Sequence, residues 1–193
     1  QDKLQIYKNA FRGCKQLNTF ENLNKAKITS LGTGVFGDCR SMTDEFVEGV
    51  LNNYATNAEI KKIPAYLFWG CNGQDGHNGT DSKKNTCTFT HLNIPAEFSV
   101  IGDGAFAYNG TDENVITLKT ITVNRVTAPT CQCVGTDKYT DVSGKEVSHK
   151  TVFDGLDPNL TTVIFENDAE GWEKTETTGF LTYMTDGSEF QRL

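Results

Sequence analysis

The sequence of 193 residues predicts an α/β-type repeat solenoid, a coil of stacked units with short parallel strands, few short helices and irregular insertions. Three observations predict this fold. A turn centred on Phe recurs along the chain, a short strand with apolar residues at fixed offsets follows the turn, and a pair of apolar residues spaced three apart precedes it. Because one short unit cannot bury its apolar edge alone, we expect the units to stack and share a continuous core.

The Phe-centred turn occurs five times. In each copy a small or apolar residue precedes the Phe, and a Gly or Cys usually follows closely. The five segments are AFRGC (10–14), VFGDC (35–39), LFWGC (67–71), AFAYN (105–109) and VFDGL (152–156). The distance between successive Phe residues grows along the chain, which indicates that the later copies carry insertions.

A short strand is predicted after the turn, with apolar residues at offsets 0, 3 and 5. They are Phe89, Leu92 and Ile94 in copy three, Leu118, Ile121 and Val123 in copy four, and Leu160, Val163 and Phe165 in copy five. Since side chains alternate along a strand, offsets 3 and 5 share the core-facing side, and offset 0 belongs to the turn. Copy one keeps Leu17 and Phe20 of this pattern, and copy two keeps Met42.

Before the Phe, apolar residues stand three apart, and each pair is followed by Gly or Pro. The pairs are Ile28 with Leu31, Ile60 with Ile63, and Phe98 with Ile101. This pattern predicts a second extended segment in each unit.

An insertion at residues 44–58 places Phe46, Val50 and Tyr54 four apart, which predicts an amphipathic helix. Gly49 weakens that pattern, and the alternative is a strand at 42–46 followed by a loop.

Two further insertions interrupt the units. Residues 72–85 are rich in Gly, Asn and Asp and predict a surface loop, and residues 131–151 predict a small hairpin on the flank of the coil. We expect residues 1–193 to form a single domain, with repeats over about 10–165 and a C-terminal cap over 166–193, because the last unit of a stack needs a cover.

Charge and hydropathy exclude several classes of partner. The formal net charge is −7 and the pI is about 5.0, which disfavours nucleic acid or an anionic membrane as the main partner. No apolar stretch is long enough for a transmembrane segment. The chain begins at Gln1 without Met or a basic-then-apolar leader, so we expect either a removed leader or a fragment.

These motifs resemble the BspA-type bacterial leucine-rich repeat over roughly residues 10–175. The resemblance is carried by the Phe-x-x-Cys turns, ITSLGTGVFGDC (28–39), FTHLNIP (89–95), IGDGAF (101–106), TLKTITV (117–123), VTAPT (126–130) and NLTTVIFENDAEGWEK (159–174). It implies a right-handed leucine-rich repeat coil. It also implies an exported, surface-attached protein of host-associated bacteria, often held by a lipid anchor, and the family supplies no catalytic residues.

Six cysteines are present, and Cys14, Cys39 and Cys71 occupy the same place in successive copies. We interpret them as buried free thiols, because Cys commonly packs as a small core residue. A bridge between Cys71 and Cys87 is the alternative, since it would tie the ends of the loop. Cys131 and Cys133 have no assigned role.

Metal and catalytic chemistry find little support in the sequence. Cys71, His77, Cys87 and His91 lack the paired spacing typical of zinc sites, and Asp75 and Asp81 lack the spacing of a calcium loop. Paired carboxylates such as Asp44 and Glu45 are typical of solvated surface. No nucleophile motif is present. We therefore predict no metal, no cofactor and no enzymatic activity.

The candidate site is the outward face of the predicted strands, in two columns of side chains. One column holds Thr19, His91, Thr120 and Thr162, and the next holds Glu21, Asn93, Thr122 and Ile164. Five stacked strands would present a polar strip about 19 Å tall.

Such a strip suits binding of a host or cell-surface protein or glycan, as in an adhesion module outside the cell. The alternative function is a structural stalk or spacer without a ligand, because outward Thr also simply suits exposed strand positions.

Overall fold

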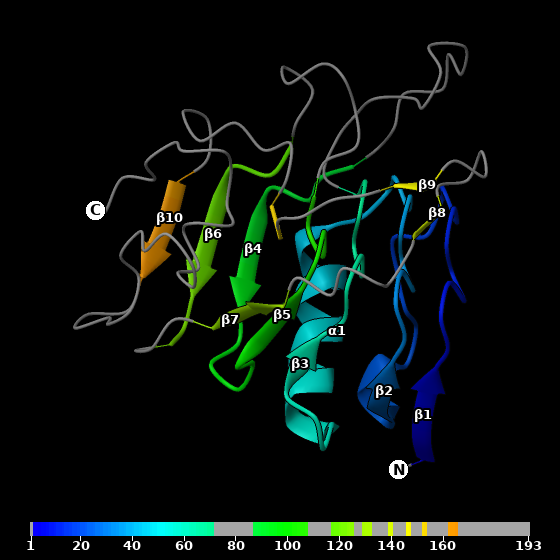
Figure 1. The fold of residues 1–193 in the computed structure, drawn as a ribbon. Coiled ribbons are helices and arrows are strands. Elements are labelled where there is room, and N and C mark those ends of the chain that lie inside the picture. The colour runs from blue at the N-terminus through cyan, green and yellow to red at the C-terminus, as the bar shows by residue number, and fades with distance from the viewer. Residues whose placement is uncertain are drawn as a thin grey trace, which may run out of the picture.

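The computed structural model describes residues 2–71, 87–107, 117–125, 129–132, 139–140, 146–147, 152–153 and 162–165. The sequence-predicted loop at 72–85 and the cap at 166–193 lie outside these ranges. Figure 1 shows β1 (Asp2–Ile6) at one side of the molecule and β10 (Thr162–Phe165) at the opposite side.

The five Phe residues that mark the copies stack into one column. Their ring centroids are 5.7 Å apart for Phe11–Phe36, 5.3 Å for Phe36–Phe68, 5.9 Å for Phe68–Phe106 and 5.7 Å for Phe106–Phe153. The last four are fully buried, and Phe11 is half-buried at the end of the column. The five turns recognised in the sequence therefore lie on one another in order.

Backbone hydrogen bonds join the stacked turns. The N–H of Phe36 donates to the carbonyl of Leu67 at 3.0 Å, and the N–H of Phe68 donates to that of Ala105 at 2.8 Å. Copy one repeats this bond, since Phe11 N–H donates to Val35 at 2.9 Å. Because the same bond recurs at the same position, the turns satisfy their own backbone groups and exclude water from the column.

Three of the predicted strands form one parallel sheet. It has the order β10-β6-β4, with β4 at His91–Ile94, β6 at Thr120–Val123 and β10 at Thr162–Phe165. Leu92 pairs with Ile121, and Ile121 pairs with Val163, so the offset-3 positions are in register. The four described core-facing residues, Leu92, Ile94, Ile121 and Val123, are fully buried. The apolar strand pattern is confirmed for copies three and four, and for copy five the strand and its register are confirmed.

The second extended segments also pair in parallel. β1 (Asp2–Ile6) pairs with β2 (Ala26–Leu31), while β3 (Lys62–Ile63), β5 (Val100–Gly102) and β7 (Thr130–Gln132) form a sheet in that order.

Two details of these second extended segments differ from the sequence-based expectation. β1 begins at Asp2, so the first unit starts before residue 10. Ile60, taken as half of an apolar pair, is 71% exposed, because the chain turns outward between α1 and β3 and only Ile63 of that pair reaches the core.

The helix α1 (Asp44–Asn57) confirms the helical interpretation of the first insertion and excludes the alternative strand at 42–46. Thr43 caps it by accepting a hydrogen bond from the N–H of Phe46 at 3.1 Å. One face is buried, with Phe46, Val50 and Tyr54 among the residues against the core. A 3-10 helix, η1 (Leu23–Lys25), lies against it.

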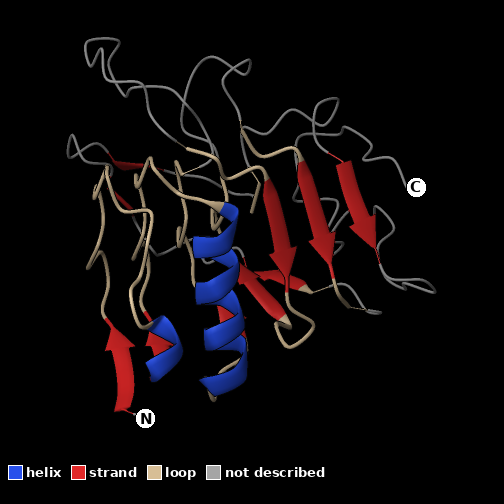
Figure 2. Cartoon of the chain, turned by 180° about the vertical axis from the view of Figure 1, so that it is seen from behind, coloured by secondary structure: helices blue, strands red, loops and turns tan. Residues whose placement is uncertain are grey.

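Helix α1 stands where copy two would otherwise place a strand. Thr43 forms a parallel bridge with Thr88 just before β4, and both views show α1 beside the β10-β6-β4 sheet (Figures 1 and 2). The expectation of five stacked strands is therefore wrong for the described residues. In that row three strands are followed by a helix and then by the strand-free segment of copy one.

The antiparallel pair β8 (Tyr139–Thr140) and β9 (Glu146–Val147) confirms a hairpin within the insertion at 131–151. The start of that insertion behaves differently, because Cys131 lies on β7 and pairs with Ile101.

Candidate binding face

The sheet β10-β6-β4 presents a row of polar residues to the outside. We call His91, Asn93, Thr120, Thr122 and Thr162 the polar strip. His91 is exposed, and Asn93, Thr120 and Thr122 are half-buried, while the residues between them are fully buried. The alternation of β4 and β6 therefore turns the side chains of His91, Asn93, Thr120 and Thr122 away from the core.

The parallel register aligns the residues of the polar strip across the three strands, in the columns expected from the sequence. His91 pairs with Thr120, which pairs with Thr162, and Asn93 pairs with Thr122, which pairs with Ile164. For Thr162 and Ile164 the structure describes the backbone position alone.

Asn124 lies beside the second column, two residues after Thr122, and was missed by sequence reasoning. Its side-chain amide donates to the side-chain oxygen of Asn93. The two amides restrain each other, so both side chains have fewer rotamers to lose if they bind a further group. The signal in the sequence was an Asn placed directly after the strand.

Asp44 fixes the edge of the strip. Its carboxylate accepts hydrogen bonds from the N–H of Thr90 at 2.7 Å, the N–H of His91 at 2.8 Å and the hydroxyl of Thr90 at 3.0 Å. The interpretation of Asp44 as solvated surface is therefore wrong. Asp44 links the start of β4 to the first turn of α1. A negative charge in the first turn of a helix also interacts favourably with the helix dipole.

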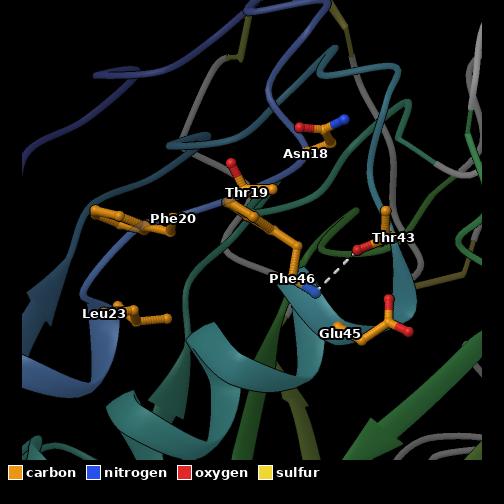
Figure 3. Close-up of a pocket in the computed structure, with 7 residues that line it drawn as sticks. All are labelled: Asn18, Thr19, Phe20, Leu23, Thr43, Glu45 and Phe46. Carbon is orange, nitrogen blue, oxygen red and sulfur yellow. Dashed lines mark hydrogen bonds between the residues drawn. The ribbon is translucent and has the colours of Figure 1, made fainter.

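Thr19 does not join the strip. It is exposed in a segment without strand structure, on the far side of α1 from β4, and Glu21 follows it in a turn. Thr19 instead lies at the rim of a pocket of about 480 Å³ between copy one and the start of α1 (Figure 3).

The pocket has an apolar floor and a polar rim. Phe20, Leu23 and Phe46 form the floor, and the rings of Phe20 and Phe46 stack with centroids 6.3 Å apart. Asn18, Thr19, Thr43 and Glu45 line the rest. A helix is wider than the strand it replaces, so the segment of copy one cannot close on α1 as neighbouring strands close on one another.

The buried thiols connect successive copies. Cys39 donates its S–H to the carbonyl of Phe11 at 3.0 Å, and Cys71 donates to that of Phe36 at 2.9 Å. Cys87 donates to the carbonyl of Cys71 at 3.0 Å. Burial raises the pKa of Cys39 to about 12 and also raises the pKa of Cys71 and of Cys87. These thiols are therefore protonated donors at neutral pH.

Cys14, Cys39, Cys71 and Cys87 are all free, so the alternative of a Cys71–Cys87 bridge is wrong. Cys14 is exposed, because copy one has no preceding turn to cover it in this structure. The side chains of Cys131 and Cys133 lie outside what the structure describes.

Within the described ranges, His, Cys, Asp and Glu residues form no group of three or more that could hold a metal ion. His77, Asp75 and Asp81 lie outside those ranges. The described part of the chain also contains no helix with the length and apolar character needed to cross a bilayer.

In the described residues, the stacked Phe-centred turns, the short parallel strands and the helix α1 together define a repeat protein. Residues 2–75 match the family model of the BspA type leucine rich repeat region, a model of six copies. This match confirms the sequence resemblance for that part of the chain and supports a repeat-based binding or structural module. No curated protein and no solved structure matches the chain.

Proposed function

We propose that this chain is a secreted or cell-surface binding module that recognises a host or cell-surface protein or glycan through the polar strip. The observation that carries the proposal is the register of β4, β6 and β10. It lines up His91, Thr120 and Thr162, and beside them Asn93 and Thr122, on one outward face.

The strip suits recognition because its frame is rigid. Strands β4 and β6 are anchored by fully buried side chains, and Asp44 and Asn124 restrain two edges of the strip. Hydroxyl, amide and imidazole groups both donate and accept hydrogen bonds, as sugar hydroxyls and peptide groups require. A pre-ordered surface loses little conformational entropy when it binds.

The wider setting belongs to the same proposal. The chain forms a right-handed leucine-rich repeat solenoid, with residues 1–193 as one domain, repeats from β1 to about residue 165 and a cap at 166–193. It is exported and attached to the cell surface, with a lipid anchor upstream as one route of attachment. The family match and the acidic composition support this setting.

The second candidate function is a stalk or spacer that binds nothing itself. It is favoured by the modest exposure of the strip, since Asn93, Thr120 and Thr122 are all half-buried. Threonine is also a residue that suits outward strand positions without any ligand.

The test is a binding panel of purified host matrix proteins and surface glycans. A variant carrying His91→Glu, Thr120→Glu and Thr122→Glu is compared with the native chain. The control carries Gln5→Glu, Gln16→Glu and Asn52→Glu, three exposed positions away from the strip that add the same charge. Binding lost only in the first variant, with both variants folded, supports the strip. Binding retained by it refutes the strip, and binding by no chain favours the spacer.

A further inference from the structure

The segment of copy one next to the pocket has unused backbone groups. Asn18, Thr19 and Phe20 follow one another without strand structure, and in the described structure their N–H groups donate to no acceptor. In copies three to five the residues equivalent to Thr19 and Phe20 belong to paired strands. Copy one therefore offers backbone N–H groups with which a further strand can pair.

The pocket beside this segment offers apolar surface. Phe46 is almost fully buried, but Phe20 and Leu23 keep part of their surface exposed above it. Elsewhere in the stack the corresponding positions are closed, since Leu92 and Ile121 are fully buried. An apolar side chain entering the pocket would complete a packing layer that copy one leaves open.

The negative charge of Glu45 at the rim favours a cationic group next to the apolar side chain of the ligand. Glu45 is the one charged residue lining the pocket, it is exposed, and it forms no ion pair or hydrogen bond with the residues described. The exposed Glu21 follows Phe20 in the chain. A cationic group would find complementary charge there.

We propose that this pocket binds an extended peptide segment of a partner protein, with an apolar side chain on Phe20, Leu23 and Phe46 and a neighbouring Lys or Arg beside Glu45. The peptide backbone pairs with residues 18–20 as an added strand. This proposal rests on the proposed function of a binding module, but it uses a site separate from the polar strip.

Other ligand classes fit the pocket less well. The acidic rim repels nucleic acid and anionic lipid surfaces. A neutral glycan would leave the Glu45 charge without a partner and the unpaired N–H groups without a strand. The combination of free backbone, apolar floor and single carboxylate favours a peptide.

The experiment displays a library of random ten-residue peptides to the full chain and measures the affinity of the enriched sequences. We compare Thr19→Trp, which fills the pocket from its exposed rim, and Glu45→Gln, which removes the charge. The matched control is Glu48→Gln, an exposed position on the same helix that does not line the pocket.

We expect enriched peptides to pair an apolar residue with Lys or Arg. Thr19→Trp should abolish their binding, Glu45→Gln should weaken it about fivefold, as expected of an exposed ion pair, and Glu48→Gln should leave it unchanged. Absence of enrichment, or enriched peptides that bind Thr19→Trp as tightly as the native chain, overturns the proposal. Neither result bears on the polar strip, since the strip variants are measured on a different ligand panel.

Discussion

The thiol of Cys71 donates to the backbone carbonyl of Phe36, 2.9 Å away, and so joins one copy of the repeat to the copy before it. Cys39 makes the same bond to Phe11. The Cys of the repeat therefore acts as a buried donor that fixes the spacing of adjacent turns. It stabilises the stack only while it keeps its proton.

The protonation of Cys39 predicts a loss of stability at alkaline pH. Burial raises its pKa from 9.0 to about 12, so the unfolded chain loses this proton first as the pH rises. Stability should be unaffected by this thiol below pH 9 and should fall by about 1.4 kcal/mol per pH unit between pH 9 and pH 12. Urea unfolding of the native chain and of Cys39→Ala measures this. An equal pH slope in both proteins would contradict the assignment.

The Phe column predicts a large effect of a single truncation. Phe68 is fully buried and stacks on both Phe36 and Phe106. Phe68→Ala should lower the free energy of unfolding by about 3–5 kcal/mol, since it removes two ring contacts and opens a cavity in mid-column. The control Tyr7→Ala, at a side chain 75% exposed, should change it by less than about 0.5 kcal/mol. Similar effects of the two changes would argue against a continuous column.

Two glycines should respond to alanine in opposite directions. A Cβ on Gly102 would lie 2.4 Å from the backbone nitrogen of Ala65 in the copy below, so Gly102→Ala should cost about 1–3 kcal/mol. Gly49 lies within α1, and its Cβ would meet only the Leu23 side chain at 3.5 Å. Gly49→Ala should therefore stabilise the protein by about 0.5–1 kcal/mol. Thermal unfolding of both variants checks the two signs, and a stabilising Gly102→Ala would show that the copies approach less closely.

Asn53 is predicted to be the residue that attaches α1 to the first two copies. Its side chain accepts from Ile28 N–H at 2.8 Å and donates to the carbonyls of Leu23 and Ala26 at 3.0 Å each. Asn53→Ala leaves these backbone groups without partners and should cost about 2–3 kcal/mol. Asn52→Ala, at an exposed position on the same helix, is the matched control and should be nearly neutral. Chemical denaturation distinguishes them, and equal costs would contradict this attachment.

Much of the repeat was predictable because its signals are local and recur. The Phe positions, the apolar offsets of β4, β6 and β10, and the helix at 44–57 all follow from spacing that the structure repeats in space. The outward columns followed as a consequence, since alternation and parallel register leave no other arrangement.

The remaining features depend on contacts between distant residues. Nothing near Asp44 in the sequence indicates that it binds Thr90 and His91, and the replacement of one strand by α1 displaced Thr19 from the predicted strip. The pocket at Phe20 and Phe46 arises from that replacement, so no single sequence motif predicts it.

The central claim is that ligand is held on the polar strip, and site-specific photo-crosslinking tests it most directly. A photoreactive phenylalanine at Thr122 is compared with one at Tyr7, which is exposed at the N-terminal end of the stack. With a ligand from the binding panel, the account predicts a crosslink from position 122 and none from position 7. A crosslink from position 7 alone, or equal crosslinking from both, would contradict the claim.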